Sequence, residues 1–291
     1  MTNAIGIMQG RLLPPTLDRI QAFPVGNWQS EFRSASEAGL DCIEWIYELD
    51  TEDHNPLGTD AGMAEIREVV AETGVQVLSV CGDYYMPERL VALDGTVRQD
   101  MVEHLFWMIE RASMVGARHL VLPFVDASSL SSQAELDGLL EVLKLALPAA
   151  RSAGIGLHIE TDLPAEKLAI IVRDEGADPL VRITCDIGNE ASLGLLPQEQ
   201  YKELAPMLGS VHVKDRSLGG DTVPLGQGDA DLDAIFGICA AISYEGIFIL
   251  QVARGEEGDE LALAKRNREI VERHWQDALK RENPLRLPEN A

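Results

Sequence analysis

The sequence is poor in basic residues and cysteines and has no long apolar run. Lys and Arg number 24 against 48 Asp and Glu, so the formal net charge is −24. Such a surface repels a phosphate backbone, which argues against nucleic-acid binding. No apolar run reaches the roughly 18 residues of a membrane-spanning helix. The start MTNAIGIMQGR also lacks the basic region and cleavage pattern of a secretory signal.

Two further absences reduce the number of fold classes and cellular compartments that the sequence allows. The four cysteines, Cys42, Cys81, Cys185 and Cys239, show no CxxC spacing. Three of them fall in predicted strands or at a strand end, which favours a reduced cytoplasmic protein over a disulfide scaffold. The GxGxxG fingerprint and the phosphate-binding P-loop pattern are missing as well. Their absence weakens the case for an open, doubly wound sheet.

Short apolar runs rich in Val, Ile and Leu recur along the chain, each followed by a stretch with helical spacing. Such runs are too short for helices and are typical of buried parallel strands. They are predicted at residues 5–9, 42–46, 75–80, 119–122, 156–160, 181–186, 210–214 and 246–251. Eight strand–helix pairs in strict alternation predict an α/β fold, a closed (β/α)8 TIM barrel with a C-terminal helical extension. No linker marks a second domain, so we expect one domain over residues 1–291.

Polar side chains stand at or near the ends of the last four predicted strands. They are Glu160, Asp186, His212 and Gln251. Barrel strands end at one rim, so these side chains are expected to converge although they are far apart in sequence. Two carboxylates, an imidazole and an amide suit a divalent ion such as Mn²⁺, Co²⁺, Zn²⁺ or Mg²⁺. A single polar residue at a strand end often only caps a loop, but three on successive strands favour a metal site.

The segments LHIETD, CDIGN, VHVKD and PLGQGDADLDAIF together resemble the sugar-phosphate isomerase/epimerase family of the xylose isomerase-like TIM-barrel superfamily. GIMQGRL and AGLDCIEWI are similar to it too, so the resemblance runs from about residue 5 to 254. It implies a metal-dependent enzyme of carbohydrate metabolism with a small-molecule substrate, and homo-oligomers are common in that family. By this resemblance Glu160 is both metal ligand and catalytic base, and Asp186 and His212 are further ligands.

Gln251 departs from the family pattern, because the epimerases have a second metal-bound glutamate at this position. Epimerisation removes a proton from one face of a carbon and returns one to the other, which two facing carboxylates can do. An amide has no useful proton to exchange. Isomerase or epimerase chemistry with Glu160 as base is the first hypothesis. A lyase or dehydratase using the same enolate chemistry, or a sugar-binding module without catalysis, are the alternatives.

Two side chains share a strand face with these residues. His158 lies two positions before Glu160, and Lys214 lies two positions after His212. This spacing places each pair on one side of its strand. Either residue is a candidate for proton transfer or substrate binding; a packed histidine and an ion-paired lysine are the equally weighted alternatives.

Further residues are expected to contact the substrate. Glu44 lies in the second strand, where glutamates face the pocket in the resembled family. Asn189 follows Asp186 and suits either a sugar hydroxyl or a turn. Arg11, Arg216 and Arg254 follow the first, seventh and eighth strands, and barrel enzymes often bind phosphate near the last two loops. The three arginines are therefore a candidate anion site, with pairing to surface carboxylates as the alternative.

Overall fold

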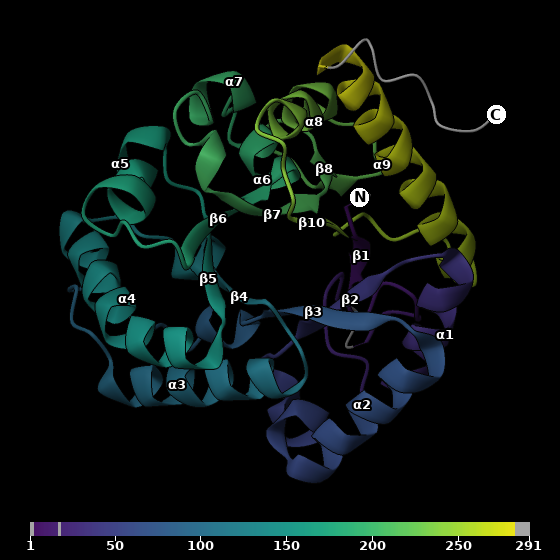
Figure 1. The fold of residues 1–291 in the computed structure, drawn as a ribbon, viewed down its shortest axis with the longest axis horizontal. Helices are drawn as coiled ribbons and strands as arrows, with labels where there is room; N and C mark the ends of the chain where they lie inside the picture. The colour runs from purple at the N-terminus through teal and green to yellow at the C-terminus, as the bar shows by residue number, and fades with distance from the viewer. Residues whose placement is uncertain (1–2, 17–18, 283–291) are drawn as a thin grey trace.

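The structure is a computed structural model that describes residues 3–16 and 19–282. Eight parallel strands close into a barrel in the order β1-β10-β7-β6-β5-β4-β3-β2, with helices around the outside (Figure 1). The predicted TIM barrel with a long C-terminal helix is confirmed. That one domain spans residues 1–291 stays a prediction, because residues 283–291 lie outside the described part.

The strands match the predicted runs closely. The barrel consists of β1 Ile5–Met8, β2 Cys42–Ile46, β3 Gln76–Cys81, β4 His119–Phe124, β5 Gly156–Thr161, β6 Val181–Asp186, β7 Leu208–Val213 and β10 Ile247–Leu250. Nearly every strand position is buried, since one face fills the barrel and the other packs under helices.

The helices cover the barrel. They are α1 Trp28–Ala38, α2 Asp60–Thr73, α3 Gln99–Met114, α4 Gln133–Ala153, α5 Ala165–Ala169, α6 Ile187–Ser192, α7 Pro197–Gln200, α8 Leu232–Ala241 and α9 Glu260–Glu282. A π-helical segment, Ile170–Asp174, continues α5. The 3-10 segments are Leu49–His54, Pro56–Gly58, Asp83–Tyr85, Asp126–Ser128 and Ala205–Met207.

Local signals set several helix ends. At the start of α4 the Ser132 Oγ accepts from the Glu135 N–H at 3.2 Å, and the Glu135 carboxylate accepts from the Ser132 N–H at 3.0 Å. This reciprocal pair is a capping box. Gly74 ends α2 with a φ of 78°, a left-handed conformation that costs glycine little.

Two stretches after β6 differ from the sequence prediction. The expected loop after Asp186 forms α6, because the Asp186 carboxylate accepts a hydrogen bond from the Asn189 N–H at 2.8 Å and caps the helix. The glycine-rich loop after β7 contains a small antiparallel hairpin, β8 Asp215–Arg216 with β9 Thr222–Val223. Both features shape the rim where the predicted site residues lie.

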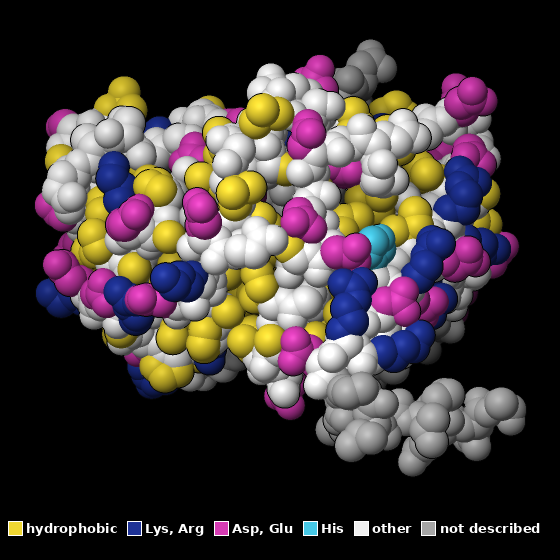
Figure 2. Space-filling model, turned by 90° about the horizontal axis from the view of Figure 1, so that it is seen from above, with side chains coloured by type: hydrophobic (Ala, Val, Ile, Leu, Met, Phe, Trp, Pro, Cys, Tyr) yellow, Lys and Arg dark blue, Asp and Glu magenta, His cyan; other side chains and the backbone are white. Residues whose placement is uncertain are grey.

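The outer surface offers no continuous basic groove on the face drawn in Figure 2, where basic side chains are interspersed with acidic ones. Among the described residues no helix is long and apolar enough to cross a bilayer.

Candidate metal centre and active-site cavity

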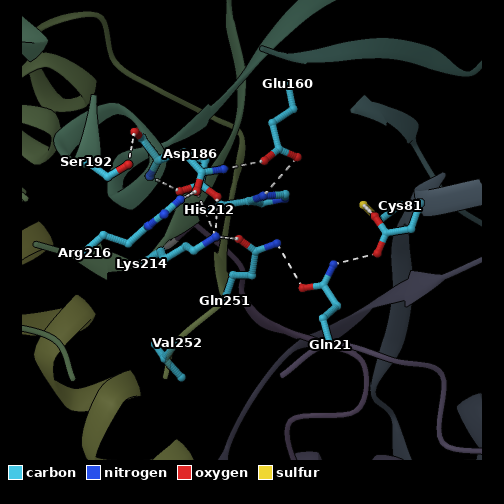
Figure 3. Close-up of polar contacts among 12 residues, drawn as sticks. Gln21, Cys81, Glu160, Asp186, Ser192, His212, Lys214, Arg216, Gln251 and Val252 are labelled. Carbon is cyan, nitrogen blue, oxygen red and sulfur yellow. Dashed lines mark hydrogen bonds and ion pairs between the residues drawn. The ribbon is translucent and has the colours of Figure 1, made fainter. Parts of the chain in front are cut away.

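Glu160, Asp186 and His212 come together at the C-terminal ends of β5, β6 and β7 (Figure 3). Asp186 and His212 are register partners in the parallel β6–β7 pair. One possible ligand atom from each of the three residues lies within 4.8 Å of the others. Protein ligands stand about 2.0–2.2 Å from an ion such as Zn²⁺, so neighbouring ligand atoms are about 3–4 Å apart. The cluster therefore needs little adjustment to hold one divalent ion.

His212 is turned so that one ring nitrogen faces this cluster. Its Nε2 lies 2.8 Å from Glu44 Oε1 in a close ion-pair contact, and its Nδ1 lies 3.7 Å from Glu160 Oε2. His212 is fully buried, and neither Nδ1 nor Nε2 forms a hydrogen bond of regular geometry with a described residue, although Nε2 lies 2.8 Å from Glu44 Oε1. A carboxylate close to one ring nitrogen fixes the tautomer of a histidine and leaves the lone pair of the other nitrogen free to bind a metal ion. An unpartnered buried nitrogen beside two carboxylates fits a divalent cation.

Glu44 is placed differently from the predicted substrate contact. Its side chain is completely buried inside the barrel, and Ser79 Oγ donates to its Oε2 at 2.6 Å. Burial raises the pKa of Glu44, but the charge and hydrogen bonding of His212 and the hydrogen bond from Ser79 together lower it by more, so the net pKa lies below its ordinary value. Glu44 is therefore held as a carboxylate against His212, and it does not border the cavity described below.

Glu44→Gln is expected to lower the affinity for Mn²⁺ by about 10–100-fold, because supporting carboxylates of metal-bound histidines contribute by that amount. Calorimetric titration of the metal-free protein measures it. Glu31→Gln is a matched control, since Glu31 is equally buried but accepts from the Leu12 N–H in the loop after β1. Equal affinities in the two variants would show that Glu44 does not position His212.

Charge coupling within the cluster is strong. Burial raises the pKa of Glu160 to about 8, although His212 opposes this rise. Burial lowers the pKa of His212, but Glu44 and the other nearby carboxylates raise it to about 9. A cation bound between these groups would replace protons, so metal binding would be accompanied by proton release.

Lys214 ties three predicted residues together. Its Nζ donates to Asp186 Oδ2 at 3.2 Å, Asn189 Oδ1 at 3.0 Å and Gln251 Oε1 at 3.2 Å. The Gln251 Nε2 donates in turn to Gln21 Oε1 at 3.1 Å. A carbonyl oxygen has two lone pairs, so Gln251 keeps one for an ion. Its role as a fourth ligand stays a prediction.

His158 lies in the packed interior below Glu160. Its Nδ1 is 2.9 Å from Ser210 Oγ, and its ring stacks on His119 with centroids 3.8 Å apart. Burial lowers the pKa of His158 well below the usual value. These contacts favour the packed histidine over the predicted catalytic role.

The three arginines do not gather around one anion site. Arg254 donates to three backbone carbonyls of the loop after β1, and Arg11 Nε donates to Val252 O at 3.0 Å. Arg11 and Arg254 border a separate cavity of about 260 Å³ between the loops after β1 and β10. Arg216 instead donates to the Gly220 carbonyl and to Asn189. Their guanidinium groups fasten loops in this structure.

Glu160, Asp186 and His212 form what we call the metal-ligand cluster, since they are the candidate ligands. A cavity of about 460 Å³ opens onto this cluster and is bordered by Glu160, Asn189, Lys214 and Gln251. Its other wall comes from the loops after β1 to β4. A larger groove of about 910 Å³ on the outer face of α4 contains none of the predicted site residues.

Sequence reasoning missed the acidic wall of this cavity. Its additional carboxylates are Glu48, Asp50, Asp83 and Asp126. Each lies just beyond the end of a barrel strand, and that position is a signal of function in this fold. Gln21 also borders the cavity, but it lies in an irregular loop where no pattern points to it.

The model of the family described as xylose isomerase-like TIM barrel matches residues 32–274. This chain belongs to that family. Among curated relatives, the L-ribulose-5-phosphate 3-epimerase UlaE of Shigella flexneri serotype 5b (strain 8401) is 25% identical over 243 residues, covering 80% of this chain and 84% of the relative.

Two solved structures share the fold. An L-ribulose 3-epimerase has a TM-score of 0.74 at 19% identity, with 100% of both chains covered. A xylose isomerase-like TIM barrel protein from Mycobacterium smegmatis in complex with magnesium has a TM-score of 0.71 at 21% identity, covering 96% of this chain and 98% of that one.

Proposed function

We propose that this protein is a metal-dependent isomerase or epimerase of an unphosphorylated keto sugar. The observation that carries the proposal is the position of Glu160, which belongs to a metal-ligand cluster and also borders the cavity. The epimerase activities named for the relatives support a sugar as the substrate. Glu160, Asp186 and His212 would hold the cation, which is Mn²⁺, Co²⁺, Zn²⁺ or Mg²⁺ by its ligand types.

The chemistry follows from the base and its surroundings. Glu160 removes the proton from the carbon next to the substrate's carbonyl, because its carboxylate borders the cavity and carboxylates serve as general bases. When bound, a divalent cation supplies Lewis-acid stabilisation of the developing negative charge. Lys214 and Asn189 line the cavity wall, where Lys214 holds Asp186 and Asn189 in place and the Asn189 Nδ2 donates to Glu160 at 3.3 Å.

The charge of the cavity argues against a phosphorylated substrate. Five carboxylates border it, namely Glu48, Asp50, Asp83, Asp126 and Glu160. The basic side chains on its wall are Arg19 and Lys214, and both are already paired with carboxylates. A phosphate dianion placed here would meet the carboxylates of Glu48, Asp50 and Asp126 with no free basic group, whereas a neutral sugar would find many hydrogen-bond acceptors.

A lyase or dehydratase acting through the same enolate is the second candidate, because Gln251 brings no second carboxylate to the strand-8 position. The four cysteines are buried and free, which supports a cytoplasmic location. Self-association, and the absence of nucleic-acid and membrane partners, stay predictions.

Incubation of the metal-loaded protein with ketoses in deuterium oxide tests the proposal. L-Ribulose is expected to gain deuterium at the carbon beside its carbonyl, with a kcat/KM at least about 10-fold above that for L-ribulose 5-phosphate, one unfavourable charge contact being worth about that factor. Protein stripped by a chelator is the control. Equal exchange into the phosphate would overturn the charge argument. If no ketose or aldose gained deuterium, the proposed enzyme activity would be overturned, and a sugar-binding module without catalysis would be the remaining interpretation.

A further inference from the structure

Asp83 is a cavity-bordering carboxylate that the mechanism above does not use. It begins the 3-10 segment after β3. Gln21 Nε2 donates to its Oδ2 at 2.7 Å, and Cys81 Sγ donates to its Oδ1 at 3.1 Å. Glu48 and Asp50 are paired with Arg19. Asp83, by contrast, forms no salt bridge with a described basic residue and is held by neutral donors.

A directed chain of hydrogen bonds ends at this carboxylate. Lys214 donates to Gln251, Gln251 donates to Gln21, and Gln21 donates to Asp83. Figure 3 shows Gln21 and Cys81 across the site from Asp186 and Lys214. A glutamate at position 251 has no N–H to give to Gln21. The amide of Gln251 thus fits the task of fixing Gln21, and through it Asp83, on the far wall.

Two properties suit Asp83 to proton donation. Burial raises its pKa above the ordinary value of an aspartate, although the bonds from Gln21 and Cys81 lower it, and a raised pKa favours the protonated form. Burial also raises the pKa of Cys81 well above the ordinary value, so its thiol keeps the proton that it donates to Asp83. The side chain therefore has fixed neutral donors and no salt bridge with a described basic residue, although the charge of His212 acts to lower its pKa.

We propose that Asp83 is the second proton-transfer residue of the site, acting on the substrate from the wall opposite the metal-ligand cluster. This inference rests on the proposed function. Glu160 takes the proton, and the C–H electron pair enters the carbon–carbon double bond of an enediolate. The Asp83 carboxylic acid then gives its proton to the same carbon from the other face, the double-bond pair forms the new C–H bond, and the carbonyl returns. Glu160 ends protonated and Asp83 ionised, and exchange with solvent resets both.

Asp83→Asn separates the two half-reactions, because asparagine keeps the shape and the hydrogen bond from Gln21 but carries no acidic proton. The metal-loaded variant is incubated with L-ribulose in deuterium oxide, and both deuterium incorporation and the new epimer are followed. We expect epimer formation to fall by at least about 100-fold, while Glu160-dependent deuterium incorporation stays within about threefold of the unmodified protein. Asp83→Glu is expected to recover part of the epimer formation.

Asp94→Asn is the matched control, since Asp94 lies in the same β3–α3 connection but only accepts from the Thr96 N–H in an exposed turn. It is expected to leave both rates unchanged. Wild-type epimer formation by Asp83→Asn would overturn the role of Asp83 and leave the proposed function standing. If a folded Asp83→Asn variant lost deuterium exchange and epimer formation equally, Asp83 would not act in a step distinct from proton removal by Glu160, and the proposal for Asp83 would also be overturned. No exchange by the unmodified protein would overturn both proposals.

Discussion

Glu160→Gln is expected to lower turnover by about 1,000-fold or more, because glutamine keeps the shape and an oxygen ligand but cannot accept the substrate's proton. The lost group is the carboxylate that both belongs to the cluster of candidate metal ligands and borders the cavity. Turnover of L-ribulose, or of whichever ketose exchanges, measures the effect. Bound metal, measured by elemental mass spectrometry, is expected to remain detectable.

The control for this substitution is Glu166→Gln, the same change at an exposed position of α5 just beyond β5. It is expected to match the unmodified protein in both turnover and metal content. If the turnover of Glu160→Gln stayed within about 10-fold of the unmodified protein, the loss would be far smaller than removal of a general base causes. Glu160 would then not be the base. A loss of turnover that tracks complete loss of metal would assign Glu160 to binding the ion alone.

His212→Ala is expected to abolish metal binding and to destabilise the metal-free protein by about 3–5 kcal/mol, because Glu44 then remains as a buried charge without its partner. The folded-state pKa of His212, about 9, lies above its unfolded value of 6.5. Its stabilisation is therefore complete below about pH 6.5 and is lost as the pH rises through about 9. Denaturant unfolding at pH 6 and pH 9 measures this difference.

A second histidine–carboxylate pair offers the control. His274 Nδ1 lies 3.0 Å from Asp233 Oδ1 at the surface, where such pairs contribute at most about 1 kcal/mol. His274→Ala is expected to change stability by no more than that amount and to leave metal binding intact. If the two alanine variants unfolded at the same denaturant concentration, the His212–Glu44 pair would not hold the barrel interior together.

The part of the site that lies on strands was predictable, and the part that lies on loops was not. Strict alternation of apolar runs and helical stretches fixes a barrel, and a barrel brings strand ends together. Glu160, Asp186 and His212 could therefore be grouped from sequence alone. Gln21 and Asp83 meet only because an irregular loop folds over the rim, and local sequence does not encode that path.

The sequence also did not show which partner each inward-pointing side chain contacts. The period of two along a strand says that Glu44 points inward, but it does not say whether a carboxylate reaches the substrate or a histidine on β7. The arginines after β1, β7 and β10 read as an anion site by position. Most of their donors instead bind backbone carbonyls, and Arg216 also donates to Asn189; only the folded loops reveal those partners. The capping role of Asp186 in α6 was within reach, because aspartate is a favoured N-cap residue.

The fastening of the loop after β1 by Arg11 and Arg254 has a consequence for how the protein acquires its pocket. The first and last strands meet only at ring closure, and these two arginines bind across that seam. A partly folded chain in which β5, β6 and β7 had already assembled would carry the three candidate metal ligands but would lack the wall that contains Gln21. Binding of the proposed cation could therefore precede completion of the native state, whereas the cavity is complete only once the last strand has docked.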